Sequence, residues 1–183
     1  TLNPNEYRYS NADEYIRHSY RGGWCYLKKG CENKIYRKGL TADVNSLYPS
    51  MMHSESGNYY PIGKPTFFKG SIPPKCLTDR FYYFVRIRTR FYLKPNKLPF
   101  VQIKGSFFYR ATEMLETSDI VDKDTGIAST WYKDFDGNIK KAIVEMVLTQ
   151  TDFELLQEHY NLVDFELLDG CYFDTIKGLF DEY

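Results

Sequence analysis

Residues 43–50, which read D-V-N-S-L-Y-P-S, combine side chains that can hold a metal ion and a phosphate group next to each other. Asp43 offers a carboxylate, and the main-chain carbonyl of Val44 can add a second oxygen ligand. Magnesium takes one or two protein carboxylates and completes its shell with water and substrate phosphates. Asp43 is therefore the candidate catalytic metal ligand, with Val44 beside it.

Residues 46–49, which follow this carboxylate closely, predict the start of a helix over residues 46–53. Ser46 is a favourable N-cap, and Pro49 falls in the first turn, where its missing N–H does no harm. The free N–H groups near Leu47 and Tyr48 would then face an anion. The Tyr48 ring could exclude a ribose 2′-hydroxyl and so select deoxyribonucleotides. A loose D-x-x-S-x-Y-P pattern is equally typical of an ordinary capped helix, so the full string carries the prediction.

The sequence before Asp43 predicts the elements that would position it. Residues 24–27 and 36–42 have the pattern of strands, with a polar turn over 28–34, and Asp43 would end the second strand. Ser10 could cap a helix over residues 11–20, with Ile16 facing inward. Residues 54–75 are rich in Gly, Pro and Ser and predict a loop or winding connection.

Residues 81–93 alternate with the period of a strand and give it one basic face. That face carries Phe84, Arg86, Arg88 and Arg90, and the opposite face is mostly apolar. Further strands are predicted over 100–103, 127–132, 139–148 and 163–173, the last with a possible bulge at Gly170. Residues 134–138 predict a hairpin turn, and Thr151 would cap a helix ending at residue 160.

Together these elements predict an α+β chain of mostly antiparallel strands with a few short helices. The 183 residues can bury one core, with or without a second lobe, and the mean hydropathy is −0.51. No apolar run approaches the roughly 20 residues of a membrane span. The four cysteines show no C-x-x-C spacing, which favours a reducing compartment and argues against a metal cluster. We expect a protein without membrane partners, in the cytoplasm.

The net charge of zero hides two halves of opposite charge. Residues 1–110 carry 19 Lys and Arg against 7 Asp and Glu, and residues 111–183 carry 5 against 17. The basic half suits phosphate contacts, and the acidic half suits a basic protein partner. Clustering by chance on solvated faces is the other explanation that the sequence allows.

Residues 43–50 closely resemble motif A of family B DNA polymerases. Tyr20, Arg21, Gly22 and Gly23 are similar to the Y-x-G-G linker of the same family, which precedes motif A and touches template DNA. Two glycines let a backbone approach a phosphate closely, and an arginine can pair with one. The resemblance thus implies a DNA-contacting role for these four residues.

Residues 99–109 resemble an insertion found in the protein-primed subgroup of these polymerases, and residues 151–160 and 170–180 are similar to that subgroup too. In that subgroup the insertion contacts the terminal protein, whose hydroxyl starts the new strand, and the primer-template duplex. Lys104 matches a lysine associated with those contacts. Met114 stands where the subgroup has an aromatic residue, so a stacking role there is in doubt.

The resemblance implies deoxynucleotidyl transfer with two magnesium ions. Asp43 and Val44 would bind metal, Ser46, Leu47 and Tyr48 would seat the deoxynucleoside triphosphate, and the partners would be primer-template DNA and a terminal protein. Residues 1–54 would be the linker and first palm segment, 55–178 the insertion, and 179–183 the start of the fingers. For a phage or prophage protein, the compartment would be the host cytoplasm.

We interpret the chain as part of a longer enzyme, because it starts without methionine and lacks two family motifs, K-x-x-x-N-S-x-Y-G and Y-x-D-T-D. The second of these supplies the other metal-binding carboxylate, so the chain alone is expected to be inactive. The alternative hypothesis is a non-catalytic module that binds nucleic acid through Arg86, Arg88 and Arg90 and a basic protein through its acidic half.

Overall fold

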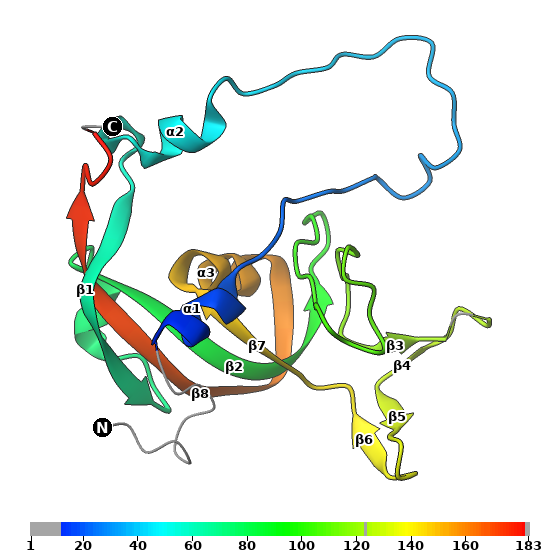
Figure 1. Cartoon of the computed structure of the whole chain (residues 1–183). Coiled ribbons are helices and arrows are strands. Elements are labelled where there is room, and N and C mark those ends of the chain that lie inside the picture. Colours follow the sequence, from blue (N-terminus) through cyan, green and yellow to red (C-terminus); the bar gives the residue numbers. More distant parts are fainter. Residues whose placement is uncertain (1–11, 123, 182–183) are drawn as a thin grey trace.

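A four-stranded antiparallel sheet forms the centre of the computed structural model, which describes residues 12–122 and 124–181 (Figure 1). The strand order is β1-β8-β2-β7, formed by β1 (Tyr59–Lys69), β8 (Tyr160–Lys177), β2 (Phe81–Leu93) and β7 (Val144–Thr149). All three pairings are antiparallel. The predicted α+β class with mostly antiparallel strands is confirmed.

Strand β2 has the bounds that the sequence predicts, and its two faces pack against different helices. Val85 and Ile87 are fully buried on one face, in a cluster with Phe153 and Leu156 of α3 (Gln150–His159). On the other face, Phe84 packs in a cluster with Tyr15 of α1 (Ala12–Ser19). Strict alternation along a strand that is covered on both sides accounts for this division.

Helix α1 lies within the predicted range, but Ser10 and Asn11 fall outside the described residues. Tyr15, at 2% exposure, is the deeply buried residue, and Ile16 packs at the edge of the same cluster. The tyrosine replaces isoleucine as the inward anchor because its hydroxyl reaches a polar group inside the sheet, described below.

The two strands predicted before Asp43 are absent: residues 20–46 contain turns but no helix or strand. Figure 1 shows this segment as a long loop that runs outside the sheet before α2 (Leu47–Met52). Ile35 and Leu40 are 96% and 94% exposed. Strand propensity alone is not enough, because a strand is stable only when its main chain pairs with a neighbour, and no described segment pairs with this one.

The loop predicted over residues 54–75 is also wrong. A 3-10 turn, η1 (Ser54–Ser56), precedes β1, and η2 (Pro74–Leu77) follows it. The prolines and glycines that suggested a loop are tolerated because β1 is an edge strand, and its pairing with β8 is irregular between Ile62 and Thr66.

The C-terminal helix and strand differ from the prediction in detail. Thr149, and not Thr151, caps α3, since its hydroxyl accepts a hydrogen bond from the Asp152 N–H at 3.1 Å. Strand β8 is longer than expected and is irregular where it passes Leu168 and Asp164, rather than at Gly170. Gly170 instead lies under the Phe68 ring, where a side chain would not fit.

Short ribbons extend from the sheet between β2 and β7. They are β3 (Ile120–Val121) with β4 (Ala128–Ser129), and β5 (Trp131–Lys133) with β6 (Ile139–Lys141). The β5–β6 hairpin confirms the turn predicted at residues 134–138, whereas the strand predicted at 100–103 is reduced to a bridge between Val101 and Leu115. Among the described residues, no helix is long and apolar enough to span a membrane.

Candidate nucleic-acid interface

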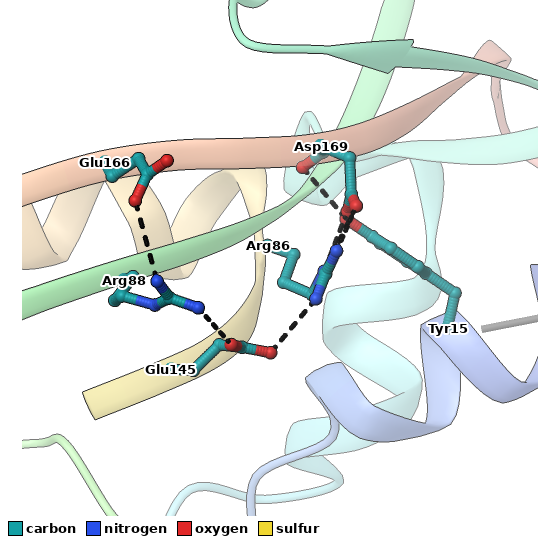
Figure 2. Close-up of polar contacts among 6 residues, drawn as sticks. All are labelled: Tyr15, Arg86, Arg88, Glu145, Glu166 and Asp169. Atoms are coloured by element: carbon teal, nitrogen blue, oxygen red, sulfur yellow. Dashed lines mark hydrogen bonds and ion pairs between the residues drawn. The ribbon is translucent and has the colours of Figure 1, made fainter. Parts of the chain in front are cut away.

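The basic face of β2 is matched by carboxylates from the acidic half of the chain. Arg86 contacts Asp169 through two nitrogens and donates to Glu145 at 3.1 Å (Figure 2). Its side chain is 13% exposed, and that of Asp169 is 3% exposed. Sheet pairing therefore brings the two oppositely charged halves together, which the linear charge count does not reveal.

Tyr15 joins this cluster from α1. Its hydroxyl lies 3.1 Å from the Asp169 main-chain carbonyl and 3.2 Å from the carboxylate, as Figure 2 shows. Burial, followed by the nearby Asp169 charge, raises the pKa of Tyr15 far above its usual range. The pKa of Arg86 is also raised, first by its hydrogen bonds to Asp169. Tyr15 thus stays neutral, and it anchors α1 to the sheet.

The other two arginines of this face are paired as well. Arg88 lies 3.3 Å from Glu145 and 3.8 Å from Glu166, and its side chain is 47% exposed. Arg90 lies 2.9 Å from Asp164. The predicted nucleic-acid contacts of Arg86, Arg88 and Arg90 stay a prediction, and the structure gives each guanidinium a carboxylate partner.

Arg21 of the Y-x-G-G segment points back into the protein. Its guanidinium donates to the carbonyls of Val147 at 2.8 Å and His18 at 3.1 Å. Desolvation lowers its pKa, and the carboxylate of Asp152 counteracts this. These contacts fasten the segment to β7, and the expected phosphate contact of Arg21 stays a prediction.

Tyr20 and Lys104, which are far apart in the sequence, lie next to each other. The Lys104 ammonium is 5.3 Å from the centre of the Tyr20 ring, and Tyr20 is 72% exposed. A methyl group added to Gly22 would lie 3.8 Å from the same ammonium, whereas Gly23 has open space. Three of the residues predicted to contact DNA, Tyr20, Gly22 and Lys104, thus form one surface.

This surface borders a cavity of about 350 Å³. Its lining includes further polar residues that the sequence reasoning did not single out as site residues: Arg17, His18, Gln102 and Glu145. Gln102 has the period-two spacing from Lys104 that could have indicated it, and Arg17 lies one helical turn before Tyr20. The lining thus combines the cations of Lys104 and Arg17 with the carboxylate of Glu145, and Arg17 is itself paired with Asp13 at 2.7 Å.

Trp24 ties the start of the long loop to the sheet region. Its ring nitrogen donates to the Pro99 carbonyl at 2.9 Å, and its ring stacks on Tyr26 at 5.5 Å. Beyond this point the loop to α2 is almost entirely exposed. The segment is therefore anchored at its start, next to Lys104.

Asp43 and Val44 lie in this exposed loop, four and three residues before α2. Ser46 occupies the N-cap position with a left-handed backbone (φ 50°), and its hydroxyl makes no capping bond. Tyr48 is 75% exposed and Leu47 is 47% exposed. The predicted helix is thus present but short, and the N-cap function of the Ser46 side chain is not observed.

The far end of α2 is held by main-chain contacts. The Met51 carbonyl accepts hydrogen bonds from Tyr60 at 2.8 Å and Asn58 at 3.0 Å. The Ser54 N–H donates to Asp181 at 2.7 Å, which joins the exit of α2 to the end of the described chain. These bonds orient the short helix from its C-terminal side.

The donor set near Asp43 fits a magnesium ion in part. No group of three or more His, Cys, Asp or Glu side chains in the described ranges could hold a metal. Magnesium needs only one or two protein carboxylates when substrate phosphates are present, and Asp43 supplies one such carboxylate.

Comparison with known proteins identifies the family. The family described as DNA polymerase type B, organellar and viral, matches residues 8–183. The chain belongs to this family of type B DNA polymerases. The DNA polymerase of Bacillus phage Nf is 36% identical over 173 residues, which are 93% of this chain and 25% of that protein. The polymerase of Streptococcus phage Cp-1 is 32% identical over 141 residues, 77% of this chain and 21% of that one.

Solved structures of a type B polymerase have the same fold. Phi29 DNA polymerase, complexed with primer-template DNA and incoming nucleotide substrates, matches with a TM-score of 0.72 and 31% identity. The match covers 93% of this chain and 25% of that one. A complex of phi29 DNA polymerase with primer-template DNA matches with a TM-score of 0.66 and 27% identity, covering 100% and 26%. The chain spans about a quarter of the length of its relatives.

Proposed function

We propose that this chain is the part of a protein-primed type B DNA polymerase that supplies one metal-binding carboxylate and holds DNA and the primer protein. The whole enzyme adds deoxynucleotides, first to a protein hydroxyl and then to a growing 3′ end. The observation that carries the proposal is the contact surface formed by Tyr20, Gly22 and Lys104, since it joins the Y-x-G-G segment to the insertion. Family membership and the phi29 complexes support it.

Asp43 is proposed as a ligand of both magnesium ions, with the Val44 carbonyl as an additional ligand of one. DNA polymerases of this type generally use Mg²⁺. When bound, the ions neutralise the charge that develops on the transferred phosphoryl group and on the attacking and leaving oxygens. The exposure of Asp43 leaves its carboxylate accessible to them.

Ser46, Leu47 and Tyr48 are proposed to seat the incoming deoxynucleoside triphosphate. The first N–H groups of a helix have no partner within it, so those at the start of α2 can donate to phosphate oxygens. The exposed Tyr48 ring is placed to contact the sugar, where it would exclude a 2′-hydroxyl. The phi29 complex with incoming nucleotide substrates supports a nucleotide ligand for this family.

The remaining residues are proposed to position nucleic acid and the terminal protein. Tyr20, Gly22, Gly23 and Lys104 offer an exposed ring, close backbone approach and a cation, while Arg21 holds their segment in place. In this division, residues 1–54 are the linker and first palm segment, 55–178 the insertion, and 179–183 the start of the fingers. The phage relatives act in replication in the host cell, and we place this enzyme in the host cytoplasm.

Two measurements test the proposal. The purified 183-residue chain should incorporate no nucleotide on a primer-template, because a second carboxylate donor is needed. In the complete enzyme, Asp43→Asn should abolish incorporation while leaving DNA binding intact. Incorporation by the chain alone, or an active Asp43→Asn enzyme, would contradict the assignment.

Binding to primer-template DNA tests the surface around Lys104. Lys104→Ala should weaken binding and reduce the magnitude of the salt slope by about 1, as expected for one lost phosphate contact. Lys64→Ala, which removes an exposed lysine from β1, is the matched control and should leave binding unchanged. Equal binding by the Lys104→Ala chain and the control would remove the support for this surface. A terminal-protein role is tested in the same way with the purified primer protein.

A further inference from the structure

Helix α2, which carries residues proposed to bind the nucleotide, has little packing of its own. It is six residues long, and none of its residues is buried against the described part of the chain. Ser46 makes no capping hydrogen bond at its start. A helix this short is only marginally stable in water unless tertiary contacts hold it. The position of α2 therefore depends on the contacts at its C-terminal end.

The main-chain carbonyl of Met51, in the last turn of α2, accepts three hydrogen bonds from described side chains. The donors are the hydroxyl of Tyr60 at 2.8 Å, the hydroxyl of Ser56 at 2.9 Å and the amide of Asn58 at 3.0 Å. The last carbonyls of a helix have no partner within it, so these side chains satisfy a group that α2 leaves free. Tyr60 belongs to β1, and its bond therefore joins α2 to the central sheet.

A second contact comes from the residues that follow β8. The Ser54 N–H, two residues after α2, donates to the Asp181 carboxylate at 2.7 Å. Hydrogen bonds with the Ser54 side chain, and then with its N–H, lower the pKa of Asp181. Gly178, with a φ of 76°, turns the chain so that the Asp181 N–H donates to the Gly178 carbonyl at 3.3 Å. Figure 1 shows α2 next to this end of the chain.

An aromatic pair links the two contacts. The rings of Tyr60 and Phe180 meet edge to face, with their centres 5.0 Å apart and their planes at 90°. Phe180 directly precedes Asp181, so this ring contact keeps the carboxylate next to the strand that carries the hydroxyl. We call Tyr60, Phe180 and Asp181 the α2 clamp.

Movement at the clamped end of α2 reaches its first turn through the hydrogen bonds of the helix. The Ser50 N–H donates to the Ser46 carbonyl at 2.9 Å, and the His53 N–H donates to the Pro49 carbonyl at 3.0 Å. Tyr48 lies three residues before Met51, which places it one helical turn away. A tilt of α2 at Met51 therefore displaces the Tyr48 ring.

We propose that the α2 clamp positions the first turn of α2 for the incoming deoxynucleotide, with Tyr60 and Asp181 as positioning residues. The inference rests on the proposed function, in which Tyr48 excludes a ribose 2′-hydroxyl. That exclusion depends on the distance between the ring and the sugar. A loosened helix should thus bind the nucleotide less well and also admit ribonucleotides more often.

Incorporation by the complete enzyme tests the clamp, with a deoxynucleoside triphosphate and the matching ribonucleoside triphosphate as separate substrates. Tyr60→Phe removes only the hydroxyl. It should lower kcat/KM for the deoxynucleotide about fivefold, as expected for one lost hydrogen bond, and lower the preference for the deoxynucleotide at least about threefold. KM for primer-template DNA should stay unchanged. Loss of stability alone would not change the preference, because it removes active enzyme equally for both substrates.

Two further variants serve as controls. Tyr59→Phe makes the same change at the preceding residue of β1, whose side chain points to the opposite face of the strand, and it should behave like the unmodified enzyme. Asp181→Asn keeps an oxygen that can accept the Ser54 N–H, so it should retain most of the activity and preference. Asp181→Ala removes that acceptor and should resemble Tyr60→Phe. Circular dichroism melting checks that every variant is folded.

Three kinetic results would overturn the proposal: equal kinetics for Tyr60→Phe and Tyr59→Phe, an unchanged sugar preference in Tyr60→Phe, or equal losses in the two Asp181 variants. Amide hydrogen exchange in the 183-residue chain needs no substrate. Exchange at Ser50 and His53 should be faster in Tyr60→Phe than in Tyr59→Phe, and equal rates would also overturn the proposal.

The outcome for Asp43 separates this proposal from the proposed function. If Asp43→Asn abolishes incorporation while the Tyr60→Phe enzyme behaves normally, the clamp fails and the proposed function stands. An active Asp43→Asn enzyme would contradict the proposed function, and the exchange rates would still decide whether Tyr60 holds α2.

Discussion

Replacing Arg86 by methionine should destabilise the protein far more than the same change at Arg88, two residues along the same face of β2. The Asp169 side chain is 3% exposed, and Arg86 neutralises it from a position that is itself 13% exposed. Arg86→Met leaves that carboxylate buried without a cationic partner. Breaking a buried ion pair in this way costs about 3–5 kcal/mol of unfolding free energy.

Arg88 provides the control because its surroundings differ mainly in exposure. Its side chain is 47% exposed and its partners Glu145 and Glu166 are 3.3 and 3.8 Å away. Solvent screens such a pair, so Arg88→Met should cost less than about 1 kcal/mol. The difference between the two variants therefore measures the effect of burial on otherwise similar arginine–carboxylate pairs.

Urea unfolding followed by circular dichroism gives the unfolding free energy and its dependence on urea for each variant. A double variant, Arg86→Met with Asp169→Leu, should recover much of the loss, since it removes the unpaired carboxylate. Tyr15 keeps a partner in that variant, because its hydroxyl also contacts the Asp169 main-chain carbonyl. Equal losses for Arg86→Met and Arg88→Met, or a double variant no more stable than Arg86→Met, would refute the reasoning.

Three further predictions concern the packing of the sheet. Gly170→Ala should cost about 1–3 kcal/mol of unfolding free energy, because the new methyl would lie 2.8 Å from a Phe68 ring carbon and close to the Phe84 carbonyl. Gly39→Ala is the control and should cost little, because the space around Gly39 is open. Equal urea midpoints for the two variants would contradict this prediction. Thr149→Ala should cost about 1 kcal/mol of unfolding free energy through loss of the α3 cap, whereas Thr151→Ala should cost less than about 0.5 kcal/mol. The reverse order in urea unfolding would show that Thr151 is the cap, as the sequence predicted. Burial raises the pKa of the Cys171 thiol from 9.0 to about 12, so the folded state favours the neutral thiol. The stability that results is present below about pH 9 and is lost as the pH rises from about 9 to about 12. Unfolding free energies measured across that range should fall less steeply for Cys171→Ala than for the unmodified chain, and parallel profiles would exclude the thiol as a cause.

Local patterns in the sequence were sufficient for the elements whose stability comes from alternation or turn chemistry. The bounds of β2 follow from strict alternation over residues 81–93, and the β5–β6 turn follows from the Asp134 side chain, which accepts hydrogen bonds from Asp136 and Asn138. Strand β1 was missed because its prolines are acceptable only at a sheet edge, and edge position is not a local property.

The candidate site also has a part that the sequence predicts and a part that only the fold reveals. Residue types and spacing identify Asp43 as a candidate metal ligand, and the resemblance of residues 43–50 to motif A indicates the polymerase family. The comparisons confirm the family. They do not show that Tyr20 meets Lys104, because this contact requires α1 to dock on the sheet through Tyr15 and Asp169.

The pairing of charged side chains shows most clearly what the tertiary structure decided. From the sequence, Arg86, Arg88 and Arg90 form a basic face in a basic half of the chain. In the fold, β7 and β8 bring Glu145, Asp169 and Asp164 from the acidic half against them. Residue identity determined which charges the protein has, but strand order determined which of them meet, because antiparallel pairing joins segments that are far apart along the chain.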